Sequence, residues 1–257
     1  MSVLGAGEAF MLASGDDAGY KIDRSLRFND NDGAHLSKTL SAGNRQTWTW
    51  SGWVKRGNLG SVQWIYAART SGNFNPYSYF YWNSDDSFTF VDQDSSGGRQ
   101  LTFKSAKRFR DPSAWYHIVV VWDTTDSTQI DRVKFYCNGE RFSDNQLTWV
   151  YPDENDLSNI NAAVQHGIGA EGNYGTGYTL DGYLADVHFV DGQALAATNF
   201  GKEDDNGVWQ PIEFTGNYST SGVSFDFLEQ ELYAGGAREA LFDGSTSTGC
   251  NFRKTFL

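Results

Sequence analysis

The sequence has few cysteines, few prolines and no long run of apolar residues. Its two cysteines, Cys137 and Cys250, form no Cys-x-x-Cys pair and supply no disulfide framework. Because no stretch of 18 apolar residues occurs, we expect no transmembrane helix. Proline occurs only 4 times, whereas aromatic residues make up 16% of the chain and glycines number 28. This balance, with few of the long charged residues that favour helices, is typical of β structure.

Basic residues are also in short supply. The chain has 20 lysines and arginines against 32 aspartates and glutamates, which gives a net charge of −12 and a pI near 4.6. Nucleic-acid binding needs a basic surface that releases counterions from phosphates. The charge therefore argues against a nucleic-acid partner and against an anionic membrane surface.

The sequence also lacks the patterns of catalysis. A retaining glycosidase needs two carboxyl groups about 5–5.5 Å apart, but no run of alternating acids occurs, and the nearest acids, Glu154 and Asp156, fall in a polar stretch. No Gly-x-Ser-x-Gly elbow is present. The four histidines do not have the spacing of a zinc site; they are His35, His117, His166 and His188. We therefore predict that the protein is not an enzyme and assign no catalytic residue.

What the sequence does contain is a series of short segments with period-two alternation. The clearest, residues 47–57, reads TWTWSGWVKRG. Residues 131–142 predict a hairpin whose turn is Asn138–Gly139. About a dozen such segments, bounded by turn residues and almost without helix, predict an all-β fold. We expect a two-sheet antiparallel jelly-roll sandwich.

One face of the predicted sheet is unusually apolar. Residues 114–123, AWYHIVVVWD, are apolar on both sides, as in a central strand that is covered on both faces. Trp53 falls opposite Trp48 and Trp50 on its strand, and Val119 and Val121 fall on the second face of theirs. We therefore predict that Trp53, Val119 and Val121 form an interface, covered by the C-terminal region or by a neighbouring copy of the chain.

Several stretches resemble the laminin-G-like, concanavalin A-like sandwich family. They are the alternating run at 47–57, the strand at 114–123 with its following hairpin at 132–142, and DGYLADVHFVDGQAL at 181–195. They occur in the family's order and spacing across residues 24–200. The resemblance implies the same two-sheet sandwich that the alternation predicts.

Longer phrases resemble a group of laminin-G-like virion proteins from phages of marine bacteria. They are RSLRFND at 24–30, AGNRQTWTWSGWVKRG at 42–57, LADVHFVDGQALAATNFG at 184–201 and DDNGVWQPIEF at 204–214. The resemblance implies a phage structural protein on the virion surface, with other virion proteins and copies of itself as partners. Since the chain has no heptads or repeats for a fibrous shaft, a capsid decoration protein is favoured over a tail or fibre component.

The resemblance also suggests how the chain is divided. We expect an N-terminal arm at 1–23, the laminin-G-like sandwich at 24–200, and C-terminal strands with an extended tail at 201–257 that packs on the sandwich. The alternative function, by analogy of fold, is a carbohydrate-binding module that recognises host surface glycans.

A carbohydrate would be bound by aromatic rings together with a few polar groups. The predicted ligand-binding residues are Tyr79, Tyr81, Trp82, Tyr174 and Tyr178. Aromatic residues that alternate along a strand are, however, also typical of a core.

A calcium ion at the rim of the sandwich, as in some members of the superfamily, is the cofactor that the resemblance allows. Its predicted ligands are Glu171, Asn173, Asp181 and Asp191. The alternative interpretation is that these side chains bond their own turns.

The acidic stretch 181–195 is interpreted as a late strand. Its alternation places one set of residues on one face, namely Tyr183, Ala185, Val187 and Phe189. The other set lies opposite, namely Leu184, Asp186, His188 and Val190. Asp186 and His188 would then be neighbours about 6.6–6.8 Å apart along the strand, with no third metal ligand nearby. Ala185 stands where the family commonly has an aspartate, which makes an acidic site less expected here.

Overall fold

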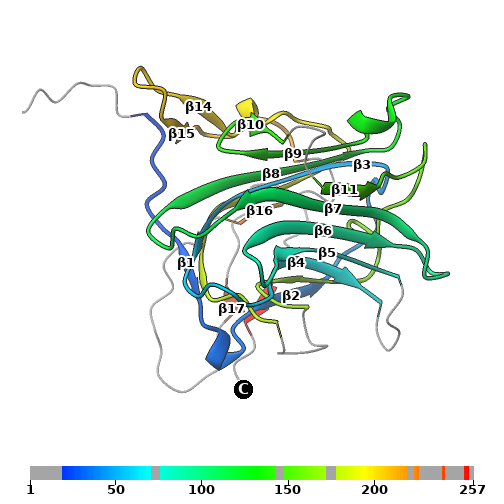
Figure 1. The fold of residues 1–257 in the computed structure, drawn as a ribbon, viewed down its shortest axis with the longest axis horizontal. Helices are drawn as coiled ribbons and strands as arrows, with labels where there is room; N and C mark the ends of the chain where they lie inside the picture. Colours follow the sequence, from blue (N-terminus) through cyan, green and yellow to red (C-terminus); the bar gives the residue numbers. More distant parts are fainter. Residues whose placement is uncertain are drawn as a thin grey trace, which may run out of the picture.

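The computed structural model describes residues 19–70, 76–142, 147–171 and 178–218, with strands at 223–225, 239–240 and 252–254. Two antiparallel sheets pack face to face (Figure 1). This confirms the predicted jelly-roll sandwich. In the described part of the chain, helix is confined to the three-residue turns η1 (Asp30–Asp32), η2 (Gln129–Asp131) and η3 (Ala197–Asn199), none of which is long enough to cross a membrane.

The first sheet, called here the seven-stranded sheet, is built around the Trp-rich strand that the sequence predicts. Its order is β1 (Leu26–Phe28), β13 (Gly182–Asp191), β3 (Thr47–Arg56), β8 (Trp115–Asp123), β9 (Val133–Cys137) and β10 (Glu140–Arg141). β16 (Val223–Phe225) also pairs with β13. β3 and β8 lie at its centre, in keeping with their apolar character.

The second sheet, called the nine-stranded sheet, faces it. Its order is β11 (Leu147–Val150), β7 (Arg99–Arg108), β6 (Ser87–Gln93), β5 (Tyr77–Trp82), β4 (Gln63–Arg69), β12 (Gln165–Ile168), β2 (Leu36–Thr39), β18 (Phe252–Lys254) and β17 (Glu239–Ala240). A separate hairpin is formed by β14 (Gly201–Glu203) and β15 (Trp209–Pro211).

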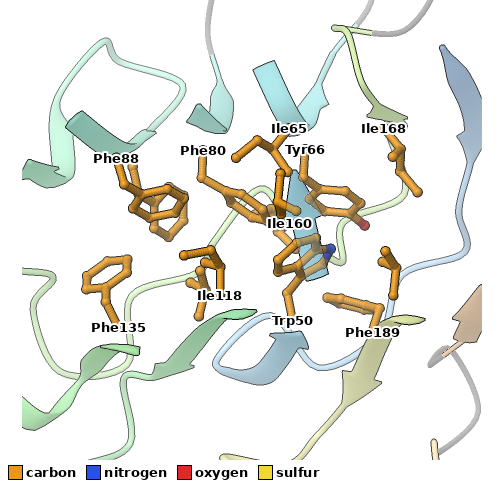
Figure 2. Close-up of a cluster of buried hydrophobic side chains, with 14 of the residues drawn as sticks. Trp50, Ile65, Tyr66, Phe80, Phe88, Ile118, Phe135, Ile160, Ile168 and Phe189 are labelled. Atoms are coloured by element: carbon orange, nitrogen blue, oxygen red, sulfur yellow. The ribbon is translucent and has the colours of Figure 1, made fainter. Parts of the chain in front are cut away.

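Large aromatic rings from both sheets fill the space between them. Trp50 of β3 meets Phe80 of β5 edge-on, with ring centroids 4.9 Å apart (Figure 2). Trp48 and Trp122 stack in parallel 6.1 Å apart on neighbouring strands. These rings are fully buried, and burying a side chain of this size contributes about 1.5–3 kcal/mol or more. The core therefore needs no disulfide, and the free Cys137 is buried within it.

β13 departs from simple alternation. A bulge lies between Ala185 and His188, and Asp186 takes the left-handed φ of +48°. The bulge reverses the phase, so that Leu184 is fully buried in the core together with Val187. The predicted faces are correct only after Asp186. Before it, Tyr183 and Ala185 face outward, whereas the alternation had placed them on the same face as Val187 and Phe189, which point into the core.

The outer face of the seven-stranded sheet is covered by the chain itself. Residues 195–218, called here the C-terminal strap, lie across it and include η3, β14 and β15. Leu195, Ala197, Phe200, Trp209, Phe214 and Tyr218 pack with Val119, Val121 and Val190. Val119 and Val121 are consequently 0% and 2% exposed, and Trp53 is 8% exposed. Of the two predicted covers, the structure shows the C-terminal region over Val119 and Val121. All three side chains are buried within one chain, so they need no neighbouring copy to cover them.

Candidate functional site

Aromatic side chains gather on the outer face of the nine-stranded sheet. On β5 the alternation sends Phe80 into the core and Tyr79 outward. β4 adds the half-buried Trp64 beside it. The loop before β13 adds Tyr178, which is 50% exposed. We call the set made of Trp64, Tyr77, Tyr79, Tyr81 and Tyr178 the aromatic patch.

The rings of this patch are stacked against one another. Trp64 and Tyr79 are parallel within 9° at 4.9 Å, and Tyr79 and Tyr77 are parallel within 11° at 4.4 Å. Tyr79 therefore stacks on two other rings of the patch. Tyr178 differs because it is tilted 49° against Trp64 at 5.1 Å. It is also the most exposed residue of the patch.

The position of Tyr178 is fixed by the backbone. Its carbonyl oxygen accepts a hydrogen bond of 2.8 Å from the N–H of Trp64, which ties the loop to β4. The ring is thus placed beside Trp64 by the main chain as well as by ring contact.

Polar groups of fixed geometry lie beside the rings. Glu171 accepts hydrogen bonds from the guanidinium of Arg69 and, at 3.2 Å, from the hydroxyl of Tyr79. Both charged side chains are largely buried, where an ion pair is screened less by water. Burial, reinforced by the charge of Glu171, raises the pKa of Tyr79. Tyr79 therefore keeps its proton and remains a donor, and the arrangement offers an apolar surface with preset polar groups.

The predicted metal ligands do not form one site. Asp181 and Asp191 lie at opposite ends of the ten-residue β13, about 30 Å apart at 3.3 Å per residue. Asp181 pairs with Arg27, and Asp191 accepts from the N–H of Asn44 at 2.7 Å and from the amide of Asn161.

Glu171 is likewise engaged by Arg69, and Asn173 lies outside the described residues. Among the residues that the structure describes, no group of three or more histidine, cysteine, aspartate or glutamate side chains could hold a metal ion. The four residues therefore do not act as a single set of calcium ligands.

Asp186 and His188 are brought together as the alternation suggests, with His188 Nε2 3.0 Å from Asp186 Oδ1. The carboxylate also accepts from Tyr20 at 2.8 Å, and His188 Nδ1 lies 2.6 Å from the hydroxyl of Tyr218. This pair thus connects the N-terminal segment, β13 and the C-terminal strap. Because both side chains are bonded to other segments of the fold, the pair has a structural role.

A match to a protein-family profile identifies the superfamily to which this sandwich belongs. The sequence profile of the laminin-G-type family described as the concanavalin A-like lectin/glucanases superfamily matches residues 28–199, more than half of the chain. The chain belongs to this superfamily. A comparison with curated proteins finds no match.

Several solved structures are similar to the chain at low sequence identity. The heptameric SAP-like pentraxin from Limulus polyphemus is 19% identical at a TM-score of 0.50, covering 79% of this chain and 91% of that chain. Domains LG4-5 of the mouse laminin alpha1 chain are 12% identical at a TM-score of 0.47, over 70% of this chain and 47% of that one. The CBM40 of the Ruminococcus gnavus IT-sialidase, bound to alpha2,3 sialyllactose, is 12% identical at 0.46, over 69% and 96%.

The predicted ligand-binding residues fall into three groups according to where they lie in the structure. Tyr79, Tyr81 and Tyr178 lie on the outer face, within the aromatic patch. Trp82 is fully buried between the sheets, because its position on β5 has the parity of Phe80. It cannot reach a ligand. Tyr174 lies outside the described residues.

Sequence reasoning missed Trp64 and its polar neighbour Arg69. A bulge in the pairing of β4 with β5, between Trp64 and Tyr66, interrupts the alternation there. A strand read at strict period two therefore assigns Trp64 the same face as the buried Tyr66. The turn residues at 57–61, close before it, are the available signal that pairing is irregular in this region.

Proposed function

We propose that this lectin-like domain is a non-enzymatic carbohydrate-binding module that uses the aromatic patch. The observation that carries the proposal is Tyr178, half of whose surface is exposed and whose ring lies against Trp64. Trp64 stacks in turn on Tyr79, which donates a hydrogen bond to the buried Glu171 of the Arg69–Glu171 pair. Carbohydrate rings offer an apolar C–H face and a periphery of hydroxyl groups, which is what an aromatic ring with adjacent charged hydrogen-bonding groups complements.

The polar neighbours support binding rather than hydrolysis. Glu171 accepts hydrogen bonds from Arg69 and Tyr79, which fix the position of its carboxylate. A glycosidase needs one carboxyl group that holds a proton as general acid near a second carboxylate. The partners of Glu171 named here, Arg69 and Tyr79, do not include a second carboxyl group.

A glycan array with the purified protein tests the proposal. We expect Tyr178→Ala to weaken binding at least about tenfold, since it removes a ring worth more than about 1.4 kcal/mol of binding free energy. The control is Ile130→Ala, which trims a side chain of 41% exposure in η2, between β8 and β9. Equal affinity of the Tyr178 variant and the wild type for every bound glycan would exclude the patch.

The same array tests for calcium. If binding is calcium-assisted, a chelator lowers it and added calcium restores it. Binding that a chelator leaves unchanged would show that the module needs no ion.

We also propose that the module works on a virion surface, as a phage structural protein. The support is the set of phrases at 24–30, 42–57, 184–201 and 204–214 that resemble laminin-G-like virion proteins. A capsid decoration protein remains favoured over a tail or fibre component, with other virion proteins and further copies of the chain as partners. The similar pentraxin is described as heptameric, so an assembly of several copies is compatible with this fold.

Mass spectrometry of purified phage particles, followed by electron microscopy with an antibody against the chain, tests this setting. We expect the chain to be present in many copies over the capsid. Its absence from washed particles would refute the virion role and leave the carbohydrate-binding proposal standing.

A further inference from the structure

A groove of about 360 Å³ lies on the opposite side of the molecule from the aromatic patch. Trp53 and Ala185 of the seven-stranded sheet line it, with Trp115 at the start of β8. The N-terminal segment Tyr20–Ser25 and the β15 residues Trp209–Pro211 form its sides. Figure 1 shows this blue segment passing beside β15. We propose that this groove is a second carbohydrate-binding site.

Three indole rings from distant parts of the chain converge in the groove. Trp115 and Trp209 are both partly exposed, whereas Trp53 is 8% exposed and lies deeper. Leaving large apolar rings open to water costs about 25 cal/mol for each Å² of apolar surface. Concave aromatic surfaces of this kind are typical of ligand sites, and the size falls near the lower end of the ~300–1,000 Å³ range for small-molecule pockets.

The walls of the groove are fixed before any ligand arrives. The buried His117 stacks on Trp53 at 4.9 Å and accepts a hydrogen bond of 2.9 Å from the indole N–H of Trp209. The Trp209 ring also packs so closely on Gly139 that a Cβ there would collide with it. Rigid aromatic walls lower the entropy cost of binding a ligand.

The rim of the groove supplies hydrogen-bonding groups of both kinds. Lys21 and Arg24 are donors, Asp23 is an acceptor, and the Gln210 amide is both; all four side chains are exposed. Hydroxyl groups donate and accept equally, so a sugar can use each of these partners. A purely apolar ligand would leave them without a role, which is why we assign a carbohydrate to this site.

This second site is independent of the aromatic patch, because the two lie on the outer faces of different sheets. One chain would then hold two glycan segments on opposite sides, so that a single copy can link two glycan chains, with the gain in overall affinity that multivalent binding gives.

Indole N–H signals in ¹⁵N NMR spectra of the full chain test the groove, with chitotetraose, cellotetraose and 3′-sialyllactose as probes up to about 10 mM, a range that detects binding near 1 mM. We expect at least one probe to shift the signals of Trp115 and Trp209 saturably. Trp115→Ala should weaken that binding at least tenfold, and Tyr178→Ala should leave it unchanged. If Trp115→Ala does not fold, Gln210→Ala at the exposed rim should weaken binding by severalfold instead.

The outcomes separate the two sites. Shifts confined to Trp64, or unchanged affinity in the Trp115 and Gln210 variants, would overturn the groove and leave the patch standing. Shifts confined to the signals of Trp115 and Trp209 would support the groove and count against the patch for these probes. If none of the three probes moves the signals of Trp115 or Trp209, the second site is refuted.

Discussion

His117 shows how one tautomer fixes two neighbours. The indole N–H of Trp209 can only donate, so His117 Nδ1 accepts it at 2.9 Å and carries no proton. The ring proton is therefore on Nε2 and is donated to the Ser51 hydroxyl at 2.8 Å. A second proton would have to go on Nδ1 and break the bond to Trp209. Burial lowers the pKa of His117 to about 3, against the attraction of Asp186.

His166 is held neutral in the same way. Its Nε2 accepts from the N–H of Asn161 at 3.0 Å, so Nδ1 carries the proton and donates to the carbonyl of Val164 at 2.9 Å. Burial lowers its pKa to about 4. Both nitrogens are used by the neutral ring, and an added proton would displace the Asn161 N–H.

These two histidines predict how stability depends on pH. Their pKa values in the folded state lie below the value of about 6.5 in an unfolded chain, so the unfolded state binds more protons as the pH falls through 6.5. When the pH falls from 7 to 5, each histidine should lower the free energy of unfolding by roughly 2 kcal/mol. Urea unfolding at the two pH values measures this loss. Equal stability at both would contradict the neutral assignment.

Asp92 has the opposite effect on the pH dependence of stability and provides a control. It is buried beneath Ser158 and Asn159, which donate to it together with Ser78. Burial nevertheless raises its pKa to about 6, so protonation between pH 7 and pH 5 stabilises the folded state by about 1 kcal/mol. Asp92→Asn should remove this gain and make the loss on acidification steeper by about that amount. A shallower dependence in the variant would refute the assigned sign.

At the scale of elements, alternation placed β3, β5 and β8 correctly wherever pairing is regular. The Asn138–Gly139 turn is confirmed as well, with φ values of +51° and +81° that suit a type I′ hairpin. Alternation failed where a bulge inserts a residue, as at Asp186 on β13 and after Trp64 on β4. A bulge depends on the partner strand, so one strand's pattern cannot reveal it.

Gly139 and Gly207 form a matched pair that tests how the hairpin supports the strap. Their φ values are +81° and +74°, but a Cβ at Gly139 meets the Trp209 ring and one at Gly207 meets nothing within 4 Å. Both alanine variants should lose about 1 kcal/mol from the left-handed backbone. Gly139→Ala should lose about 1–3 kcal/mol more through overpacking. Unfolding curves check this, and equal losses would show that Trp209 moves aside at no cost.

At the scale of the whole molecule, the sequence predicted that one apolar face of the sheet is covered, and it left two covers open: the C-terminal region or a neighbouring copy. Val119 and Val121 signal an apolar face through local pattern alone. The cover depends on Phe214 and Tyr218, almost a hundred residues later. Their phrase has no strong periodicity, so only the fold relates the two. The aromatic patch is similar, since Tyr178 and Trp64 come together through the pairing of loop and strand.

The C-terminal strap should therefore be required for the sandwich to remain folded as a single chain. Replacing Trp209, Phe214 and Tyr218 by serine removes rings that cover Val119, Val121 and Val190. We expect a loss of at least about 3 kcal/mol in unfolding free energy, together with binding of a hydrophobic dye.

The control for this triple variant is the serine triple at Lys202, Glu203 and Asp205, which are exposed in the same strap. Surface changes of this kind usually stay within about 0.5 kcal/mol. The strap variant could instead match its control in stability but form dimers. That result would mean that a second copy can replace the strap. The apolar face would then serve as an interface between chains only after the strap is released. Sedimentation of both variants distinguishes the two results, because a strap that is needed only for stability leaves each variant's folded fraction monomeric.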